Sequence, residues 1–218
     1  LRDYYDIRKK EKWQSLFGKY YIGKNPTALA SSYMMLHFDF SAIMTDSEVA
    51  AHNGFLFNVK MSVGQFIFFY FQDDYEQAKT AFASINGVNE VMKYLFTLVS
   101  QKNCAAKIYI TIDEYDHFAN ELIAWQLSVF QDVVSKNGWV RKFYESLKVA
   151  VGDGIVDRIF ITGVSPITLD SLTSGFNIVK QLSSDAILHE MMGFTKAEVE
   201  EIMLGVGATT ENLPSIME

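Results

Sequence analysis

The chain has 218 residues, of which 49% are hydrophobic and three are proline, so its composition indicates a globular protein rather than a disordered one. Its formal net charge of −7 argues against a nucleic-acid-binding surface, which is normally basic, so the sequence carries no direct nucleic-acid signal. A single cysteine, Cys104, excludes an internal disulfide and favours a reducing, cytoplasmic or intracellular location.

Helical and strand patterns alternate along the chain. In chain order we expect a helix over residues 1–17 broken near Asp6, a strand over 33–40, a helical region from Asp46 and Ser47 to about Phe71, a helix over 88–99, a strand over 107–112, helices over 117–134 and 139–150, a strand over 157–163, and a final helix that begins at Thr195. Three apolar strands separated by helices predict an α/β fold with a parallel sheet.

One apolar segment, residues 54–71, raises the alternative of a membrane span. Asn58, Lys60, Ser62 and Gln65 interrupt it, whereas a spanning helix needs about 20 mostly apolar residues. A helix buried against the sheet is therefore the favoured interpretation, and no membrane association is expected.

The stretch GKYYIGKN, Gly18 to Asn25, nearly fits the phosphate-loop pattern G-x-x-x-x-G-K-[ST]. A charged segment precedes it where a strand is needed. Asn25 replaces the hydroxyl residue that would bind Mg²⁺, and Pro26 disfavours helical geometry at Asn25. We therefore do not expect this stretch to bind phosphate.

The stretch KIYITIDEYD ends an apolar strand in Asp113 and Glu114, which is the Walker B arrangement of ATP-hydrolysing proteins. The first carboxylate would hold Mg²⁺ through its water shell while the metal bridges the β- and γ-phosphates. The second would orient or deprotonate the attacking water. The alternative is that both residues only cap the turn after the strand.

A second strand, RIFITGVSP, also ends in polar residues. Thr162 is the candidate sensor beside the γ-phosphate, and Ser165 is the next candidate for nucleotide contact. A glycine-containing turn with solvated hydroxyl groups is the alternative.

The remaining candidates have weaker patterns. The four histidines have no metal-ligand spacing, and His117 is notable because it lies beside the Asp113–Glu114 turn. Asp39 could face the same crevice or cap a turn, and Arg141 could be an arginine finger or a helix-surface residue. The other histidines and the cysteine are expected to be structural or surface residues: His37, His52, His189 and Cys104.

Five segments in order, LHFDFS, IYITIDEYD, VRKFYESLK, RIFITGVSP and MMGFTKAEVEEIM, resemble the predicted AAA-ATPase-like family. The resemblance implies a three-layer P-loop NTPase core over residues 1–194 and the start of a helical lid over 195–218. It also implies ATP and Mg²⁺ as ligands. Family members typically carry the Walker A phosphate loop just before a helix like that of Leu1–Tyr5, so we expect this chain to be a fragment that lacks the first strand and that loop.

The resulting hypothesis is ATP binding and hydrolysis coupled to a conformational change or a partner. The alternatives are a non-hydrolysing scaffold with a degenerate ATPase fold, and a regulatory ATPase linked to a downstream PD-(D/E)XK-type nuclease domain. We expect the three strands to pair in chain order and one edge of the strand at 158–163 to be unpaired. Such an edge is a template for another chain, which would allow oligomers.

Overall fold

The computed structural model describes residues 1–117, 120, 123, 130, 138–164, 178–182, 185, 188 and 194–207. The chain divides into two compact units, Leu1–Asn177 and Ile178–Glu218. Among the described residues, the elements of the first unit are α1 (Arg2–Tyr5), the 3-10 helix η1 (Ile7–Lys12), α2 (Trp13–Phe17), α3 (Tyr21–Lys24), β1 (Met34–Asp39), α4 (Glu48–Tyr70), the 3-10 helix η2 (Gln72–Asp74), α5 (Tyr75–Ser84), α6 (Val88–Lys102), β2 (Ile108–Asp113), α9 (Trp139–Gly152) and β3 (Val156–Ile161). The second unit contains α11 (Lys196–Gly205).

The sheet has three parallel strands in the order β1-β2-β3, which confirms the predicted order. In the register of the pairs, Asp39 lies opposite Asp113 and Ile112 lies opposite Ile161. Among the described residues, β3 pairs with β2 alone, as expected for its free edge. The carboxyl ends of the three strands therefore meet at one edge of the sheet.

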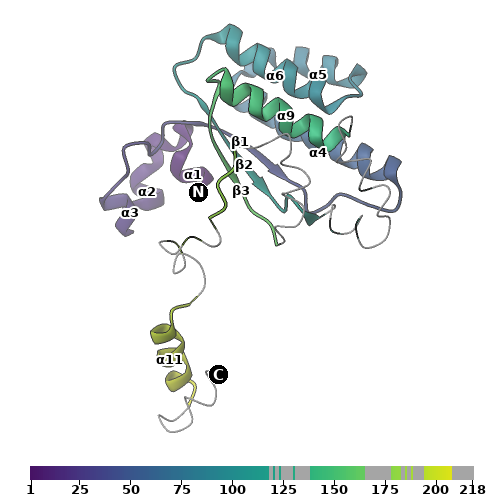
Figure 1. Cartoon of the computed structure of the whole chain (residues 1–218). Coiled ribbons are helices and arrows are strands. Elements are labelled where there is room, and N and C mark those ends of the chain that lie inside the picture. The colour runs from purple at the N-terminus through teal and green to yellow at the C-terminus, as the bar shows by residue number, and fades with distance from the viewer. Residues whose placement is uncertain are drawn as a thin grey trace. The chain divides into compact units, whose positions relative to one another are not determined.

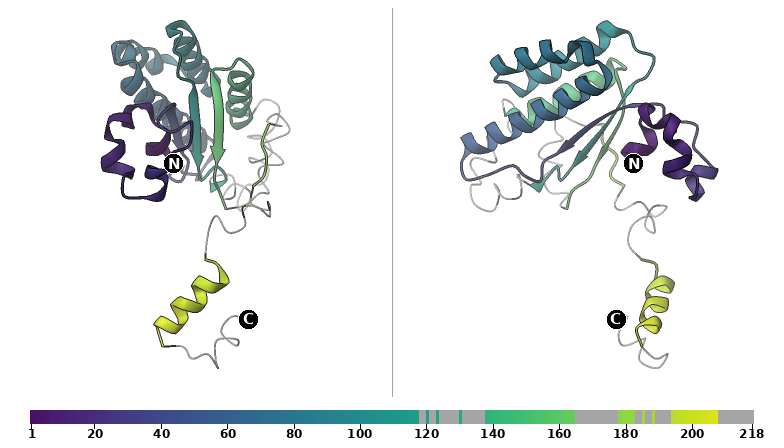
Figure 2. Two further views of the ribbon diagram at one scale, coloured as in Figure 1. Left: turned by 90° about the vertical axis from the view of Figure 1, so that its left-hand side faces the viewer. Right: turned by 180° about the vertical axis from the view of Figure 1, so that it is seen from behind.

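Successive side chains of each strand point to opposite faces of the sheet, and the two faces pack against different parts of the chain. Met34, Leu36 and Phe38 of β1 pack into the main core, which also contains side chains of helices α4, α6 and α9. These helices lie on one side of the sheet, whereas α1, α2 and α3 lie on the other (Figures 1 and 2). The opposite face holds a small aromatic cluster in which Tyr33 and Tyr109 pack at 5.5 Å between ring centroids.

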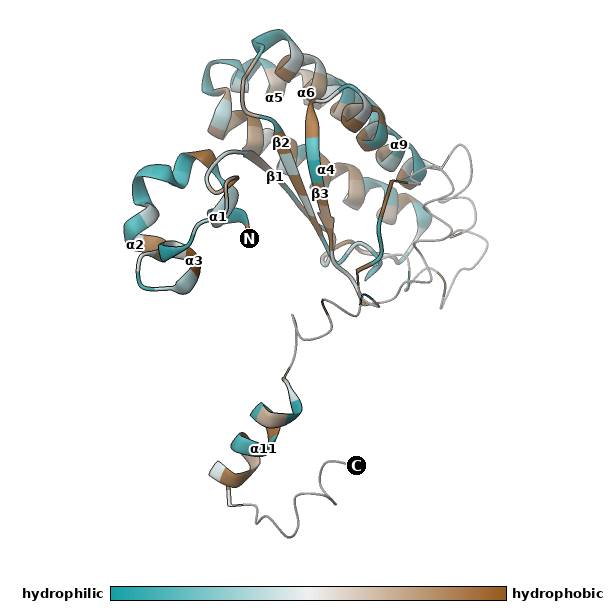
Figure 3. Ribbon diagram, turned by 60° about the vertical axis from the view of Figure 1, so that its left-hand side comes forward, coloured by the Kyte–Doolittle hydropathy of each residue, from teal (hydrophilic) through white to brown (hydrophobic). Residues whose placement is uncertain are grey.

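Strand β3 is the least buried of the three. Its first residue, Val156, is buried, but Asp157 and Arg158 are exposed and the last three residues are only partly buried. Figure 3 shows this hydrophilic band near the start of β3, followed by hydrophobic residues. The strand therefore has apolar surface that its contacts with the described residues do not fully cover.

The long helix α4 begins where the sequence predicts. Ser47 is its N-cap, and its hydroxyl accepts a hydrogen bond from the backbone N–H of Ala50 at 3.1 Å. Seven side chains of α4 are buried against the sheet and the neighbouring helices. None of the helices in the described part of the chain is long and apolar enough to cross a membrane.

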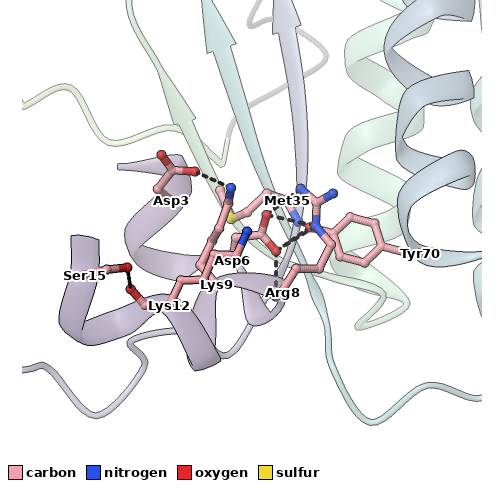
Figure 4. A network of polar contacts seen from close by, with 8 residues as sticks. All are labelled: Asp3, Asp6, Arg8, Lys9, Lys12, Ser15, Met35 and Tyr70. Atoms are coloured by element: carbon pink, nitrogen blue, oxygen red, sulfur yellow. Dashed lines mark hydrogen bonds and ion pairs between the residues drawn. The ribbon is translucent and has the colours of Figure 1, made fainter. Parts of the chain in front are cut away.

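A buried polar network holds the N-terminal helices against β1 and α4 (Figure 4). Asp6 is 2% exposed, and its carboxylate accepts hydrogen bonds from the Arg8 side chain, from the Arg8 backbone N–H and from the Tyr70 hydroxyl. Tyr70 in turn accepts from the backbone N–H of Met35 on β1 at 2.9 Å. Asp6 therefore ends α1 and also connects it to two other elements, which explains the helix break predicted there.

The segment Gly18–Asn25 has the structure of a helical turn. It joins α2 to α3, and the Trp13 indole donates to the Gly23 carbonyl at 3.1 Å. A helix precedes it rather than a strand, so it lacks the strand-loop-helix structure of a phosphate loop.

In the second unit, the described residues include helix α11 and its N-cap, Thr195. Thr195 accepts a hydrogen bond from the Glu198 backbone N–H, and the Glu198 carboxylate accepts one from the Thr195 N–H at 2.7 Å. The predicted capping box is therefore present. The predicted helix over 117–134 and the segment around Ser165 lie largely outside the described residues.

Candidate functional site

The carboxyl end of β2 is the centre of the candidate site. Asp113 is the last residue of β2 and is exposed, whereas the preceding five residues of the strand are buried. This mostly apolar run is typical of a strand that is covered on both faces, and β2 is the central strand of the sheet. The first charged side chain of the strand therefore lies where the chain leaves the core, at the sheet edge where open α/β proteins bind ligands.

Thr162 lies beside Asp113. Its hydroxyl donates a short hydrogen bond to Asp113 Oδ1, and its backbone N–H donates to the Ile112 carbonyl at 2.9 Å. The carbonyl of Thr162 accepts from the Tyr115 N–H at 3.1 Å. These hydrogen bonds connect the ends of β2 and β3, and two of the predicted site residues are direct neighbours.

Glu114 has an unusual backbone conformation. Its φ angle is +51°, in the left-handed region, which costs an ordinary residue about 1–2 kcal/mol. Its N–H donates to Asp113 Oδ1 at 3.2 Å, and its carbonyl accepts from the His117 N–H at 3.2 Å. These contacts hold the turn. Because Glu114 is left-handed, the chain departs from strand geometry immediately after Asp113, and the two adjacent carboxylates do not follow the alternation of a strand.

Asp116 is a site residue that the sequence analysis missed. It is 0% exposed, and its carboxylate accepts hydrogen bonds from the Val164 N–H at 3.1 and 3.2 Å and from the Asn120 side chain at 2.9 Å. It therefore fixes the turn after β2 to the segment after β3. The only sequence signal was a third acidic residue close to Asp113 and Glu114, because its partner at position 164 is distant in the chain.

Gly163 completes this connection. A Cβ atom at this position would lie 2.3 Å from Asp116 Oδ1 and 2.4 Å from the Tyr115 ring, closer than real contacts allow. The segment after β3 can approach the turn after β2 only because residue 163 has no side chain.

The sequence was compared with families of known proteins once this geometry was established. Residues 1–173 match the family described as predicted AAA-ATPase, AAA-ATPase_like. The chain belongs to this family. Comparison with curated proteins and with solved structures gives no match.

Membership of the AAA-ATPase-like family supports a general ATPase-like, nucleotide-binding role. The three-stranded parallel sheet and its helices are consistent with the P-loop type of core that the family name implies. Asp113, Glu114 and Thr162, which the Walker B and sensor interpretation singled out, all lie at the ends of β2 and β3, and Ser165 lies outside the described residues.

The other strand-end acid in this AAA-ATPase-like chain, Asp39, caps a turn. Its carboxylate accepts from the Ser41 N–H at 3.0 Å, and this hydrogen bond lowers the pKa of Asp39 below its usual value. Its backbone carbonyl accepts from the Asn58 side chain. Asp39 is opposite Asp113 in the register, but its contacts are those of the turn-capping alternative.

Arg141 forms an ion pair along its own helix. Its Nε contacts Glu145 Oε1 at 3.0 Å, four residues further on α9. This contact supports the helix-surface alternative over an arginine finger.

Among the histidines, His37 shares a hydrogen bond of 2.9 Å with Thr111 on the neighbouring strand, and burial lowers its pKa. His52 packs its ring on Trp139 at 5.6 Å. The N–H of His117 belongs to the turn already described, Cys104 is exposed, and His189 lies outside the described residues.

The described residues also form a cleft of about 660 Å³ between the N-terminal helices, β1 and α4. Arg2, Lys9 and His37 contribute to its lining, but Asp113, Glu114 and Thr162 do not. The cleft is therefore separate from the strand-end residues.

The described residues contain no group of three or more His, Cys, Asp or Glu that could hold a metal ion by themselves. Mg²⁺ in nucleotide sites does not need such a group, because it keeps several waters and uses one or two carboxylates plus the phosphates. Asp113 is exposed, and its Oδ2 makes no hydrogen bond to the described residues. The carboxylate of Asp113 therefore fits water-mediated Mg²⁺ binding together with a nucleotide.

Proposed function

We propose that Asp113, Glu114 and Thr162 form the hydrolytic edge of an ATP-hydrolysing core. The observation that carries the proposal is the hydrogen bond from the Thr162 hydroxyl to Asp113, which joins two neighbouring strand ends beside the left-handed turn at Glu114. Membership of the predicted AAA-ATPase family supports ATP and Mg²⁺ as the ligands.

In this proposal each residue has a separate role. Asp113 accepts a hydrogen bond from a water of the Mg²⁺ shell, and the ion neutralises charge on the β- and γ-phosphates. Glu114 accepts a proton from the attacking water or orients it. Thr162, in contact with Asp113, responds to the γ-phosphate, and Ser165 is the second polar candidate on that segment.

Binding of the phosphates needs a further part. The 218 residues contain no complete G-x-x-x-x-G-K-[ST] sequence, and the near match at Gly18–Asn25 is helical. We propose that a phosphate loop completes the nucleotide site. This loop would lie on a strand beside the edge of β3 that has no partner among the described residues, and turnover would be coupled to a conformational change or a partner.

The test uses a protein that carries both this chain and the phosphate loop. Glu114→Gln keeps the shape of the side chain but removes the base, so hydrolysis is expected to fall by about 10²-fold or more while ATP binding is retained. Asp113→Asn is expected to weaken the Mg²⁺-dependent part of ATP binding instead. Phosphate release and nucleotide titrations with and without Mg²⁺ measure the two effects.

Asp39→Asn is the matched control, since it changes a carboxylate at the end of the adjacent strand that caps a turn. It is expected to leave hydrolysis near the wild-type rate. Wild-type hydrolysis by Glu114→Gln would show that the Walker B assignment is wrong, and absence of ATP binding in every form would favour the scaffold alternative.

A further inference from the structure

The outer face of α4 carries a hydrophobic stripe. The helix buries Phe55, Val59 and Val63 against the core, yet on its outer side Phe57, Met61 and Phe68 are 66%, 51% and 45% exposed. These three positions and Gly64 follow the spacing i, i+4, i+7, i+11, so they lie along one line of the helix surface. The part of α4 that should be polar in a solvated helix is therefore apolar (the helix can be followed in Figure 1).

Gly64 lies near the middle of the stripe. The described residues of one copy of the chain would leave room for a larger side chain at this position. A Cβ atom built at this position meets nothing within 4 Å. Glycine inside a helix costs about 0.5–1 kcal/mol relative to alanine. Its effect on the surface is a notch between the large side chains of Met61 and Phe68.

The stripe is complementary to itself in an antiparallel arrangement. When Met61 of one copy lies over Gly64 of a second copy, the equal spacing of four residues also brings Phe57 of the first against Phe68 of the second. Each large side chain then has a partner, and the notch receives the methionine. We propose that α4 is an antiparallel self-association surface for a second copy of this chain, with two-fold symmetry.

The charge distribution fits this partner. The chain has a formal net charge of −7, so two copies repel each other at most surfaces. Between Val49 and Tyr70, however, α4 contains no acidic residue, and its charged side chain is Lys60 on the flank of the stripe. Two copies can therefore meet along this helix without bringing carboxylates together.

The apolar area that the dimer would bury determines how tightly two copies are expected to bind. A large apolar side chain presents about 200 Å², so the exposed fractions of Phe57, Met61 and Phe68 amount to roughly 300 Å² of apolar surface per copy. A standard interface buries about 800 Å² per partner. The dimer is therefore expected to be weak, with a dissociation constant on the order of tens of micromolar, and to exchange rapidly.

Sedimentation velocity of the full chain over a range of concentrations tests the proposal. Gly64→Met places a methionine against a methionine and is expected to weaken dimerisation at least about tenfold, as is Met61→Gly, which leaves two notches. The double variant Met61→Gly/Gly64→Met exchanges methionine and notch with the same composition. It is expected to restore the wild-type dissociation constant to within about threefold.

Gly152→Met on α9 is the matched control, because a Cβ atom at that position also meets nothing within 4 Å. It adds the same side chain to another helix and is expected to leave dimerisation unchanged. A wild-type chain that stays monomeric to about 200 μM, or a double variant that does not recover, overturns the proposal. Association that no α4 substitution alters also overturns it and points to the free edge of β3.

Cross-linking tests the antiparallel direction. In a Cys104→Ser background, a mixture of Phe57→Cys and Phe68→Cys chains is expected to form the disulfide between the two different variants. Two copies of position 57 would lie about 16 Å apart along the helix pair, which is too far for a disulfide. Preferential linkage of Phe57→Cys to itself would contradict the antiparallel arrangement.

Discussion

At the scale of single residues, the connection between the ends of β2 and β3 depends on the absence of one side chain. Gly163 lies against Asp116 and Tyr115, which are 0% and 4% exposed and cannot move outward without losing their buried contacts. The exposed polar pair of Asp113 and Thr162 is held in contact by this packing as well as by its own hydrogen bond.

Gly163→Ala is therefore expected to destabilise the fold by about 1–3 kcal/mol, the usual cost of overpacking a closely packed position. Urea unfolding followed by circular dichroism measures the change. Gly152→Ala is the control, since a Cβ atom at that position has open space and alanine favours a helix. A Gly163→Ala protein as stable as wild type would show that the turn after β2 adjusts freely.

The residues at the strand ends differ in how well the sequence predicts them. Asp113, Glu114 and Thr162 could be predicted because an apolar run of strand length ends in polar residues, a local pattern. Asp116 could not, because its role depends on the Val164 N–H, which reaches it only after α9 and β3 have folded. The left-handed conformation of Glu114 could not be predicted either, because the turn contains no glycine, the residue that usually adopts this conformation.

At the scale of elements, the Asp6 network decides how the N-terminal helices attach to the sheet. Burial alone would raise the pKa of Asp6, but hydrogen bonds from Arg8 and Tyr70 outweigh it and lower the pKa below its usual value. Burial raises the pKa of Tyr70 to about 12, so its hydroxyl keeps its proton and donates to Asp6 at neutral pH. The guanidinium of Arg8 also lies 4.1 Å from the Phe69 ring centroid.

Asp6→Asn is expected to lower the free energy of unfolding at pH 7 by about 2 kcal/mol, because hydrogen bonds to a charged acceptor are lost. A lowered pKa stabilises the folded state above the unfolded-state value near 4, and this contribution disappears as the pH falls through the folded-state pKa. The difference between wild type and Asp6→Asn should therefore shrink below about pH 4. Urea titrations at several pH values measure it.

Asp3→Asn is the control for this prediction. Asp3 contacts Lys9 at 3.4 Å, but its side chain is 61% exposed, so its removal should change stability little. A difference between wild type and Asp6→Asn that stays constant down to pH 3 would contradict the role of the Asp6 carboxylate.

Elements were predictable where the pattern was strong. The strands appeared as apolar runs, and α4 and α11 had capping residues at their starts. Helix α5 was not predicted, because it buries only Ala78 and Phe82 and its other residues give little apolar periodicity. The break at Asp6 was predicted, but the partners that bury this residue come from α4 and β1 and could not be.

At the scale of the whole molecule, the strand order β1-β2-β3 has a consequence for nucleotide affinity. It places the carboxyl ends of β2 and β3, the proposed Walker B and sensor segments, side by side at one edge of the sheet and leaves β3 paired on one side among the described residues. The carboxylates at this edge repel a polyphosphate unless a cation and a set of N–H donors compensate. In the proposed site, those donors would be the backbone amides and the lysine of a phosphate loop.

The chain of 218 residues by itself is therefore expected to bind ATP with a dissociation constant no tighter than about 1 mM. Isothermal titration calorimetry with Mg²⁺ and ATP measures this directly. Lys24→Ala is the informative variant, because Lys24 is the lysine of the near-match sequence and lies at the end of α3. Micromolar binding that Lys24→Ala abolishes would mean that Gly18–Asn25 cradles phosphate after all. Micromolar binding that survives Lys24→Ala would mean that the strand ends bind nucleotide without a phosphate loop, and either result would contradict the proposed dependence on a loop beside β3.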